Sequence, residues 1–160
     1  MVDLNPGSLF TTAPRKIRVL LVEDNSIFLA YVSRVLARDP AVHIVGRVQD
    51  GLDAIQSAAE SAPDLVLLDI GLPRMNGLQV AKHILRGLPK CRIIFLTQES
   101  APEFVEHAFE IGAAGYVLKT RANEDLWPAV LNVCEGNHFL SSGLERPTKF
   151  QSGILRLVAT

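Results

Sequence analysis

The hydrophobic positions of the chain fall into two alternating kinds of segment. Short, nearly continuous apolar runs rich in valine, isoleucine and leucine are typical of strands buried on both faces of a parallel sheet. Between these runs, apolar residues recur every three or four positions, as they do on one face of an amphipathic helix. The predicted strands cover residues 17–23, 42–48, 65–69, 92–97 and 114–118.

A helix is predicted after each of these strands. The first is expected to have Ser26 as its N-cap and to stop before Pro40, because proline cannot continue a helix. The next three are expected at about 51–61, 77–88 and 102–112, and the last is expected to reach Cys134. Five strand–helix units with right-handed crossovers predict an α/β fold. It is a doubly wound, five-stranded parallel sheet in the flavodoxin-like order 2-1-3-4-5, inside a three-layer sandwich.

The chain of 160 residues fits one domain. Residues 1–15 carry proline and glycine without periodicity, which predicts a flexible leader. The sheet and its helices are expected to occupy residues 16–139, and residues 140–160 are expected to form a tail or linker.

Composition and charge disfavour several classes of function. Apolar residues make up 48% of the chain and charged residues 21%, which is typical of a globular protein. The net charge of −1 argues against direct binding of nucleic acid or of an anionic membrane. With no apolar run of about 18 residues and no signal-peptide pattern, we expect a cytoplasmic location. The two cysteines form neither a metal-binding spacing nor a disulfide framework.

Polar residues close four of the predicted strands. Glu23 and Asp24 follow the first strand and Asp69 follows the third. Thr97 and Lys119 follow the fourth and fifth. Parallel strands end at one edge of a sheet, where open α/β folds bind ligands, so we expect these five side chains to lie together.

This grouping suits phosphoryl transfer. Neighbouring carboxylates repel one another unless a cation neutralises them, and Mg²⁺ binds one or two carboxylates while keeping waters for a phosphate. An aspartate can also act as a nucleophile toward phosphorus. With Asp69 as the acceptor, Lys119 and the metal would supply positive charge and Thr97 a hydroxyl donor.

Four motifs together resemble the receiver domain of bacterial two-component response regulators. They are the acidic pair in Val22-Glu23-Asp24, the block at 68–77 (LDIGLPRMNG), the pair Leu96-Thr97 and the segment at 112–119 (GAAGYVLK). The resemblance covers residues 16–139 and implies the flavodoxin-like receiver fold.

The resemblance also implies a role for each residue of the predicted site. Asp69 would accept a phosphoryl group from a phosphohistidine on a sensor histidine kinase or phosphotransfer protein, and Lys119 would contact that group. Mg²⁺ or Mn²⁺ would be held by Glu23, Asp24, Asp69 and the backbone carbonyl of Gly71. The chain would be no enzyme beyond assisting its own phosphorylation and dephosphorylation.

Thr97 and Tyr116 would form a switch pair, in which Thr97 moves toward the phosphate while the ring of Tyr116 turns inward. Gln98 stands where the family generally has a small residue. It would either crowd the phosphate entrance or hydrogen-bond the phosphoryl group, so Gln98 and Glu99 are expected to modulate the reaction.

Partners and output follow from the same resemblance. The helix at 102–112, the strand at 114–118 and the next helix form a face that receivers often use for homodimers or target proteins. The segments 115–119 and 135–142 resemble receivers that precede a helix-turn-helix DNA-binding domain. Residues 143–160 are too few for such a domain, so a stand-alone receiver is favoured over the receiver part of a DNA-binding transcriptional regulator.

Two other classes of protein share parts of this pattern. A phosphatase of the haloacid dehalogenase type also uses a strand-end aspartate, but it requires a second aspartate two positions later, where this chain has Gly71. A flavodoxin-like cofactor binder needs a phosphate-cradling loop after the first strand, where Glu23, Asp24 and Asn25 would repel phosphate. Both alternatives are therefore disfavoured.

Overall fold

The architecture is an α/β sandwich around one parallel sheet. The computed structural model describes residues 16–153 and 157–158, so the predicted leader at 1–15 lies outside the described residues. The five predicted strands are β2 (Ile17–Val22), β3 (Val42–Val48), β4 (Leu65–Leu68), β5 (Arg92–Thr97) and β6 (Gly115–Leu118). They pair in parallel in the order β3-β2-β4-β5-β6, which confirms the predicted order 2-1-3-4-5.

The sheet is wider than predicted. β7 (His138–Leu140) pairs in parallel with β6, and β8 (Leu157–Val158) pairs in parallel with β7. The described residues therefore form a seven-stranded sheet, and the prediction of five strands is wrong. The added strands have three and two residues, which is too short for an apolar run to be recognised in sequence.

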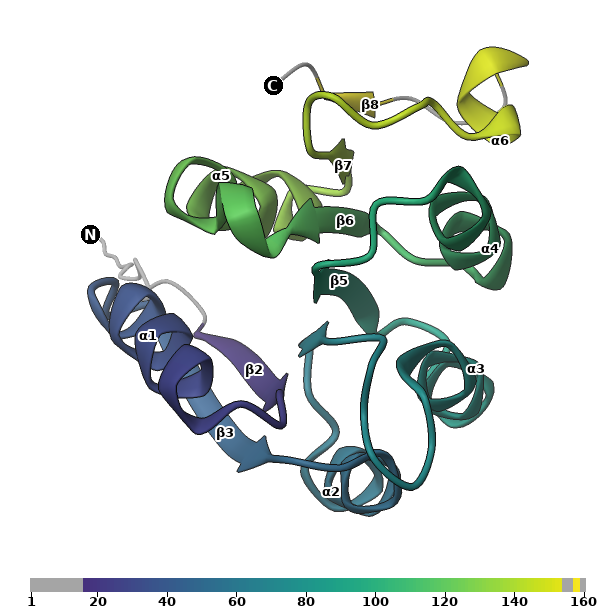
Figure 1. The fold of residues 1–160 in the computed structure, drawn as a ribbon. Coiled ribbons are helices and arrows are strands. Elements are labelled where there is room, and N and C mark those ends of the chain that lie inside the picture. The colour runs from purple at the N-terminus through teal and green to yellow at the C-terminus, as the bar shows by residue number, and fades with distance from the viewer. Residues whose placement is uncertain (1–15, 154–156, 159–160) are drawn as a thin grey trace, which may run out of the picture.

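Helices cover both faces of the sheet, as Figure 1 shows. One face is covered by α1 (Ser26–Ala37) and α5 (Ala122–Cys134). The other is covered by α2 (Gly51–Ser61), α3 (Gly77–Gly87) and α4 (Pro102–Ile111). The short helices are η1 (Lys119–Arg121) and α6 (Thr148–Gln151). Among the described residues, no helix is both long and apolar enough to cross a membrane.

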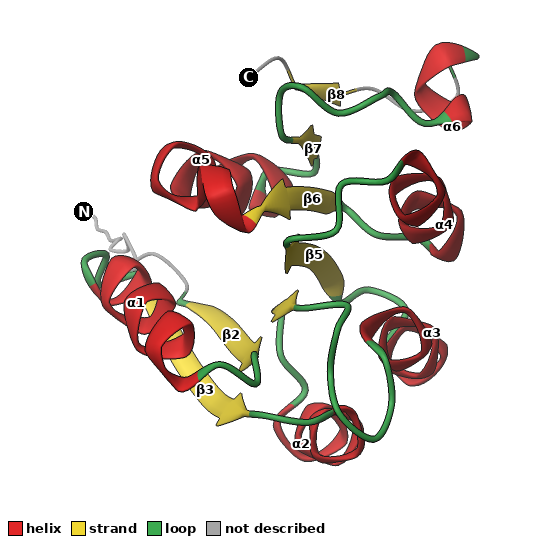
Figure 2. Ribbon diagram, in the orientation of Figure 1, coloured by secondary structure: helices red, strands yellow, loops and turns green. Residues whose placement is uncertain are grey.

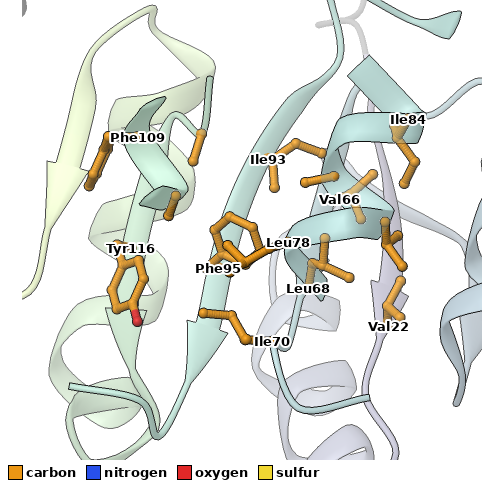
Figure 3. Close-up of a cluster of buried hydrophobic side chains, with 14 of the residues drawn as sticks. Val22, Val66, Leu68, Ile70, Leu78, Ile84, Ile93, Phe95, Phe109 and Tyr116 are labelled. Carbon is orange, nitrogen blue, oxygen red and sulfur yellow. The ribbon is translucent and has the colours of Figure 1, made fainter. Parts of the chain in front are cut away.

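The central strands divide their side chains between two cores, because successive residues of a strand point to opposite faces. Leu68 and Phe95 pack in the core under α2, α3 and α4 (Figure 3), whereas Leu67 and Ile94 pack under α1 and α5. All four are buried, and burying a side chain of this size stabilises the fold by about 1.5–3 kcal/mol. Apolar side chains thus cover both faces of the sheet, so polar side chains of the strands can be accommodated at the strand ends.

Side chains in the loops after the strands cap the helices. The Oδ1 of Asn25 accepts a hydrogen bond from the Phe28 backbone N–H at 2.9 Å, so Asn25 is the N-cap of α1 and the prediction of Ser26 is wrong. Both residue types are good caps, and the point where the chain leaves β2 decides between these neighbours. Asp50 and Asn76 cap α2 and α3 in the same way.

Candidate functional site

The ends of β2, β4 and β6 bring three predicted site residues into contact, at the sheet edge visible in Figure 2. The Nζ of Lys119 lies 2.8 Å from Asp69 Oδ2 and 2.9 Å from Glu23 Oε1. These residues are far apart in sequence, so the sheet topology alone creates the contact. The expectation that the strand-end charges gather at one edge is confirmed for this group.

Asp69 lies at the end of β4 and is only 6% exposed. Its Oδ1 accepts a hydrogen bond from the Ile70 backbone N–H at 2.7 Å, while its Oδ2 accepts from Lys119. The start of α3 presses on this turn: a Cβ added to Gly77 would lie 2.0 Å from the Asp69 backbone oxygen. Only glycine allows this approach, so Gly77 helps to fix the backbone that carries the Asp69 carboxylate.

Three carboxylates form an acidic cluster. One oxygen from each of Glu23, Asp24 and Asp69 lies within 4.8 Å of the other two. Glu23 is buried and Asp24 is exposed, so the cluster reaches from the interior to solvent. Burial raises the pKa of Glu23, and the charge of Asp69 adds to this rise against the opposing hydrogen bonds from Lys119 and the Asn25 backbone. A bound cation would reduce the electrostatic repulsion among these three carboxylates.

Lys119 is held from three sides. It bonds both Glu23 and Asp69, and its Nζ lies 4.9 Å from the centroid of the Phe28 ring. Burial lowers the pKa of Lys119, but the hydrogen bonds to Asp69 and Glu23 outweigh burial and raise it overall. The ammonium is therefore charged and oriented toward the Asp69 carboxylate.

Two residues of the site were missed by sequence reasoning. The Asn25 backbone N–H donates to Glu23 Oε2 at 3.0 Å, and the Asn25 side chain caps the turn that carries Phe28. Asn25 carried a recognisable sequence signal, because asparagine just before an amphipathic segment favours an N-cap. Phe28 did not, because its contact with Lys119 depends on how α1 packs against β2 and β3.

Thr97 and Tyr116 both contact the loop that leads into α4. The side chains of both are completely buried, and Figure 3 shows the Tyr116 ring inside the core. The Tyr116 hydroxyl donates to the Glu99 carbonyl at 2.6 Å, while the Glu99 backbone N–H donates to Thr97 Oγ1 at 3.3 Å. Burial raises the pKa of Tyr116, with the charges of Glu99 and Asp69 adding to it, so the hydroxyl keeps its proton. Gln98, which lies between Thr97 and Glu99 in the sequence, is exposed.

A buried polar network supports the end of β6 next to Lys119. Ser141 Oγ accepts from the Leu118 backbone N–H at 3.1 Å and donates to Asp125 Oδ2 at 2.7 Å. Arg121 Nε also donates to Asp125 Oδ2, at 2.9 Å. Ser141 belongs to the segment predicted as a tail, so at least this part of it helps to position the site.

Fold and site together define a flavodoxin-like α/β domain with an acidic cluster and a lysine at the carboxyl ends of its strands. The family described as the response regulator receiver domain matches residues 19–131. The chain therefore belongs to the receiver domain family of response regulators. The match lies within the predicted domain at 16–139, and the division into leader, domain and tail stays a prediction.

Two curated relatives of the chain are transcriptional regulatory proteins. It is 29% identical to the transcriptional regulatory protein DegU of Brevibacillus brevis over 125 residues, which are 78% of this chain and 53% of DegU. It is 31% identical to the probable transcriptional regulatory protein NarL of Mycobacterium tuberculosis over 131 residues, which are 82% of this chain and 61% of NarL. The chain thus spans between half and two thirds of the length of these relatives.

Solved structures agree with this assignment. A two-component response regulator of the LuxR family from Aurantimonas sp. SI85-9A1 superposes with a TM-score of 0.75 at 30% identity, covering 80% of this chain and 91% of that one. The signal receiver domain of NarL from Mycobacterium tuberculosis superposes with a TM-score of 0.72 at 33% identity, covering 78% and 100%.

Proposed function

We propose that the chain is the phosphorylated switch of a cytoplasmic two-component pathway, with Asp69 as the phosphoacceptor. The position of Asp69 carries this proposal. Its carboxylate is nearly buried at the end of a central strand, 2.8 Å from the ammonium of Lys119 and beside two further acids. A structural ion pair requires one partner, whereas three acids with one lysine leave excess negative charge for a metal ion.

The phosphoryl donor would be a phosphohistidine on a sensor histidine kinase or a phosphotransfer protein. A carboxylate oxygen of Asp69 forms a bond to phosphorus while the phosphorus–nitrogen bond breaks. The imidazole leaves with the electron pair of that bond, as a neutral ring when its other nitrogen carries a proton. Lys119 lies where it can neutralise charge on the transferred group.

The acidic cluster fits Mg²⁺ or Mn²⁺. Its donors are all carboxylate oxygens within 4.8 Å of one another, which are the hard ligands these ions prefer. The ion would be held by Glu23, Asp24, Asp69 and the backbone carbonyl of Gly71. When bound, it would neutralise negative charge on the phosphoryl oxygens.

Thr97, Glu99 and Tyr116 would transmit the state of Asp69 to α4. Thr97 and Tyr116 both bond the backbone of Glu99, in the loop that enters this helix. A phosphoryl group that draws the Thr97 hydroxyl toward itself would release the Glu99 N–H and free the loop to move. Gln98, exposed beside Thr97, and Glu99 would modulate the access of water to the phosphoryl group, so the chain would influence only its own phosphorylation and dephosphorylation.

Acetyl phosphate with Mg²⁺ tests the proposal. The wild-type chain is expected to gain one phosphoryl group that hydroxylamine removes, as measured by intact-mass spectrometry. Asp69→Asn is expected to gain none, because an amide is not a nucleophile toward phosphorus. Asp53→Asn, at a side chain that is 57% exposed, is the matched control and should be labelled like the wild type. Unchanged incorporation in Asp69→Asn would contradict the proposal.

A second candidate role is suggested by the relatives, which are transcriptional regulatory proteins that this chain matches over 53% and 61% of their length. The chain would then be the receiver part of a DNA-binding regulator and would not itself contact DNA. Binding of operator-containing DNA by the product of the whole source gene, with and without acetyl phosphate, is the measurement. Phosphorylation-dependent DNA binding by that product would favour this role over the stand-alone one.

A further inference from the structure

Lys119 lies at the junction of β6 and η1, and a side chain holds the backbone on its β6 side. β7 ends at Leu140, which pairs with Tyr116, so this neighbouring strand stops before it reaches Leu118. The Leu118 backbone N–H donates instead to Ser141 Oγ at 3.1 Å. Ser141 therefore continues the pairing of β6 and β7 with its side chain, up to the residue that directly precedes Lys119.

Ser141 is itself fixed through its backbone and its side chain. Its backbone N–H donates to the Tyr116 carbonyl at 3.0 Å, and its hydroxyl donates to Asp125 Oδ2 at 2.7 Å. The residue is only 1% exposed. The hydroxyl uses its single proton on Asp125 and a lone pair on Leu118, so its rotation is fixed as well.

The carboxylate of Asp125 also holds the chain on the η1 side of Lys119. Asp125 belongs to α5, is 4% exposed, and accepts from Arg121 Nε at 2.9 Å and from Arg121 Nη2 at 3.3 Å. Arg121 is the last residue of η1, the turn that begins at Lys119, and the Ala122 backbone N–H donates to the Lys119 carbonyl. One buried carboxylate thus connects residues on both sides of Lys119.

A requirement for geometry explains this network better than a requirement for stability. Taking charged side chains out of water costs desolvation, and apolar side chains of similar size often stabilise a fold as well or better. Joined polar bonds, in contrast, fix where a backbone segment lies. The Nζ of Lys119 lies 2.8 Å from Asp69 and 2.9 Å from Glu23, and a misplacement of about 1 Å can slow a reaction about 100-fold.

We propose that Ser141 and Asp125 are positioning residues for phosphoryl transfer, which hold the backbone of Lys119 so that its ammonium faces Asp69. The inference rests on the proposed function of Asp69 and adds a further part of the chain to it. Ser141 lies beyond residues 19–131, which match the receiver domain family, and directly follows β7, the strand beside β6 in Figure 1. The segment after α5 therefore contributes to the site through its contact with β6.

Initial rates of phosphorylation by acetyl phosphate with Mg²⁺, measured by intact-mass spectrometry of the full chain, test this role. Ser141→Ala leaves the Leu118 N–H without its acceptor and is expected to slow the reaction about tenfold, because Lys119 is less well placed. In a Lys119→Ala background the same substitution is expected to slow it less than about twofold, because residues that act through one group are not additive. A purely structural role would give the same factor in both backgrounds.

Ser33→Ala is the matched control. The Ser33 hydroxyl also joins an arginine to a carbonyl, because it accepts from Arg47 Nε at 2.9 Å and donates to the Leu29 carbonyl at 2.8 Å. Arg47 belongs to β3, at the opposite edge of the sheet from β7 and β8. Ser33→Ala is therefore expected to keep the phosphorylation rate within about twofold of the wild type.

A second variant is available if circular dichroism shows that Ser141→Ala does not fold. Asp125→Asn keeps the size of the side chain and one acceptor oxygen, but it loses the charge that pairs with Arg121. It is expected to slow phosphorylation about threefold in the wild-type background and not in the Lys119→Ala background.

The ¹H–¹⁵N signals of the lysine ammonium groups give a readout that needs no phosphorylation. The Lys119 signal, assigned by its absence in Lys119→Arg, is expected to shift in Ser141→Ala and to stay unchanged in Ser33→Ala. An unchanged signal in Ser141→Ala, a rate within twofold of the wild type, or equal slowing in both backgrounds would each overturn the proposal. If the wild type gains no phosphoryl group, the proposed function of Asp69 fails, while the ammonium signal still tests how Lys119 is positioned.

Discussion

The two ends of the parallel strands both carry partly buried cations, but these cations have different partners. At the carboxyl end, Lys119 bonds two carboxylates, Glu23 and Asp69. At the amino end, the side chain of Arg18 donates to the Ser61 carbonyl and that of Arg92 to the Val133 carbonyl. These carbonyls lie in the last turns of α2 and α5, where positive charge stabilises a helix C-terminus.

The amino end also has an opening. A cavity of about 690 Å³ lies there, bordered by Asp64, Cys91 and Arg92 among others. Burial raises the pKa of Cys91 to about 12, so its thiol keeps its proton and is a poor nucleophile at neutral pH. Neither the size of a cavity nor the presence of a charge therefore distinguishes the end that we propose for phosphorylation. The cluster of carboxylates around Lys119 does.

Removing the cation of the carboxyl end should have the largest effect. Lys119→Ala is expected to lower the initial rate of phosphorylation by acetyl phosphate about 100-fold, because the charge facing the transferred group is lost. Lys119→Arg, which keeps the charge, should retain much more of the rate. Both rates are measured by intact-mass spectrometry with Mg²⁺ present. A rate for Lys119→Ala within twofold of the wild type would mean that the two ends do not differ in the way described.

Removing a cation of the amino end should lower the stability of the fold and leave the rate of phosphorylation nearly unchanged. Arg92→Ala is expected to lower the free energy of unfolding by about 1–2 kcal/mol, because the Val133 carbonyl loses a charged donor. Urea unfolding measures this loss, and the phosphorylation rate should stay within about twofold of the wild type. Lys90→Ala, at the exposed neighbouring cation, is the control and should change the free energy by less than about 0.5 kcal/mol. A large loss of phosphorylation in Arg92→Ala would contradict the expectation that cations at the amino end serve stability alone.

Burial of the strands and local capping rules explain which features the sequence predicts well. The strand β4 is buried throughout and β5 is buried beyond Arg92, so their apolar runs stand out. Parallel pairing then places Asp69 and Lys119 at one edge. Residues of the site that act through local rules, such as Asn25 as a helix cap, are also within reach of sequence reasoning.

Contacts between distant segments are harder to predict. β7 and β8 owe their conformation to the neighbouring strand, since three and two residues have little strand preference of their own. The docking of Phe150 on Phe109 and the approach of Phe28 to Lys119 depend in the same way on packing geometry, which composition and periodicity do not encode. The predicted tail at 140–160 thus includes residues that pack on the domain.

The smallest expected effect is on the pH dependence of stability, through His138 at the amino end of β7. Burial lowers the pKa of His138 below its ordinary value of 6.5, and the charges of Arg92 and Lys149 lower it further. The unfolded chain then binds a proton more readily than the folded one. The contribution of His138 to stability is therefore complete above pH 6.5 and is lost as the pH falls through the folded-state pKa.

His138→Gln removes this titration. The free energy of unfolding, measured with urea, should then change less between pH 7.5 and pH 5.5 than it does in the wild type. This difference should be smaller than the loss of free energy caused by Arg92→Ala. His107→Gln, at an exposed histidine of α4, is the matched control and should follow the wild type. If the plots of unfolding free energy against pH stay parallel for the wild type and His138→Gln, the fold does not disfavour the protonated form of His138. Because the titration is confined to the amino end, His138→Gln should leave the rate of phosphorylation at pH 7.5 unchanged, which sets it apart from any change at Lys119.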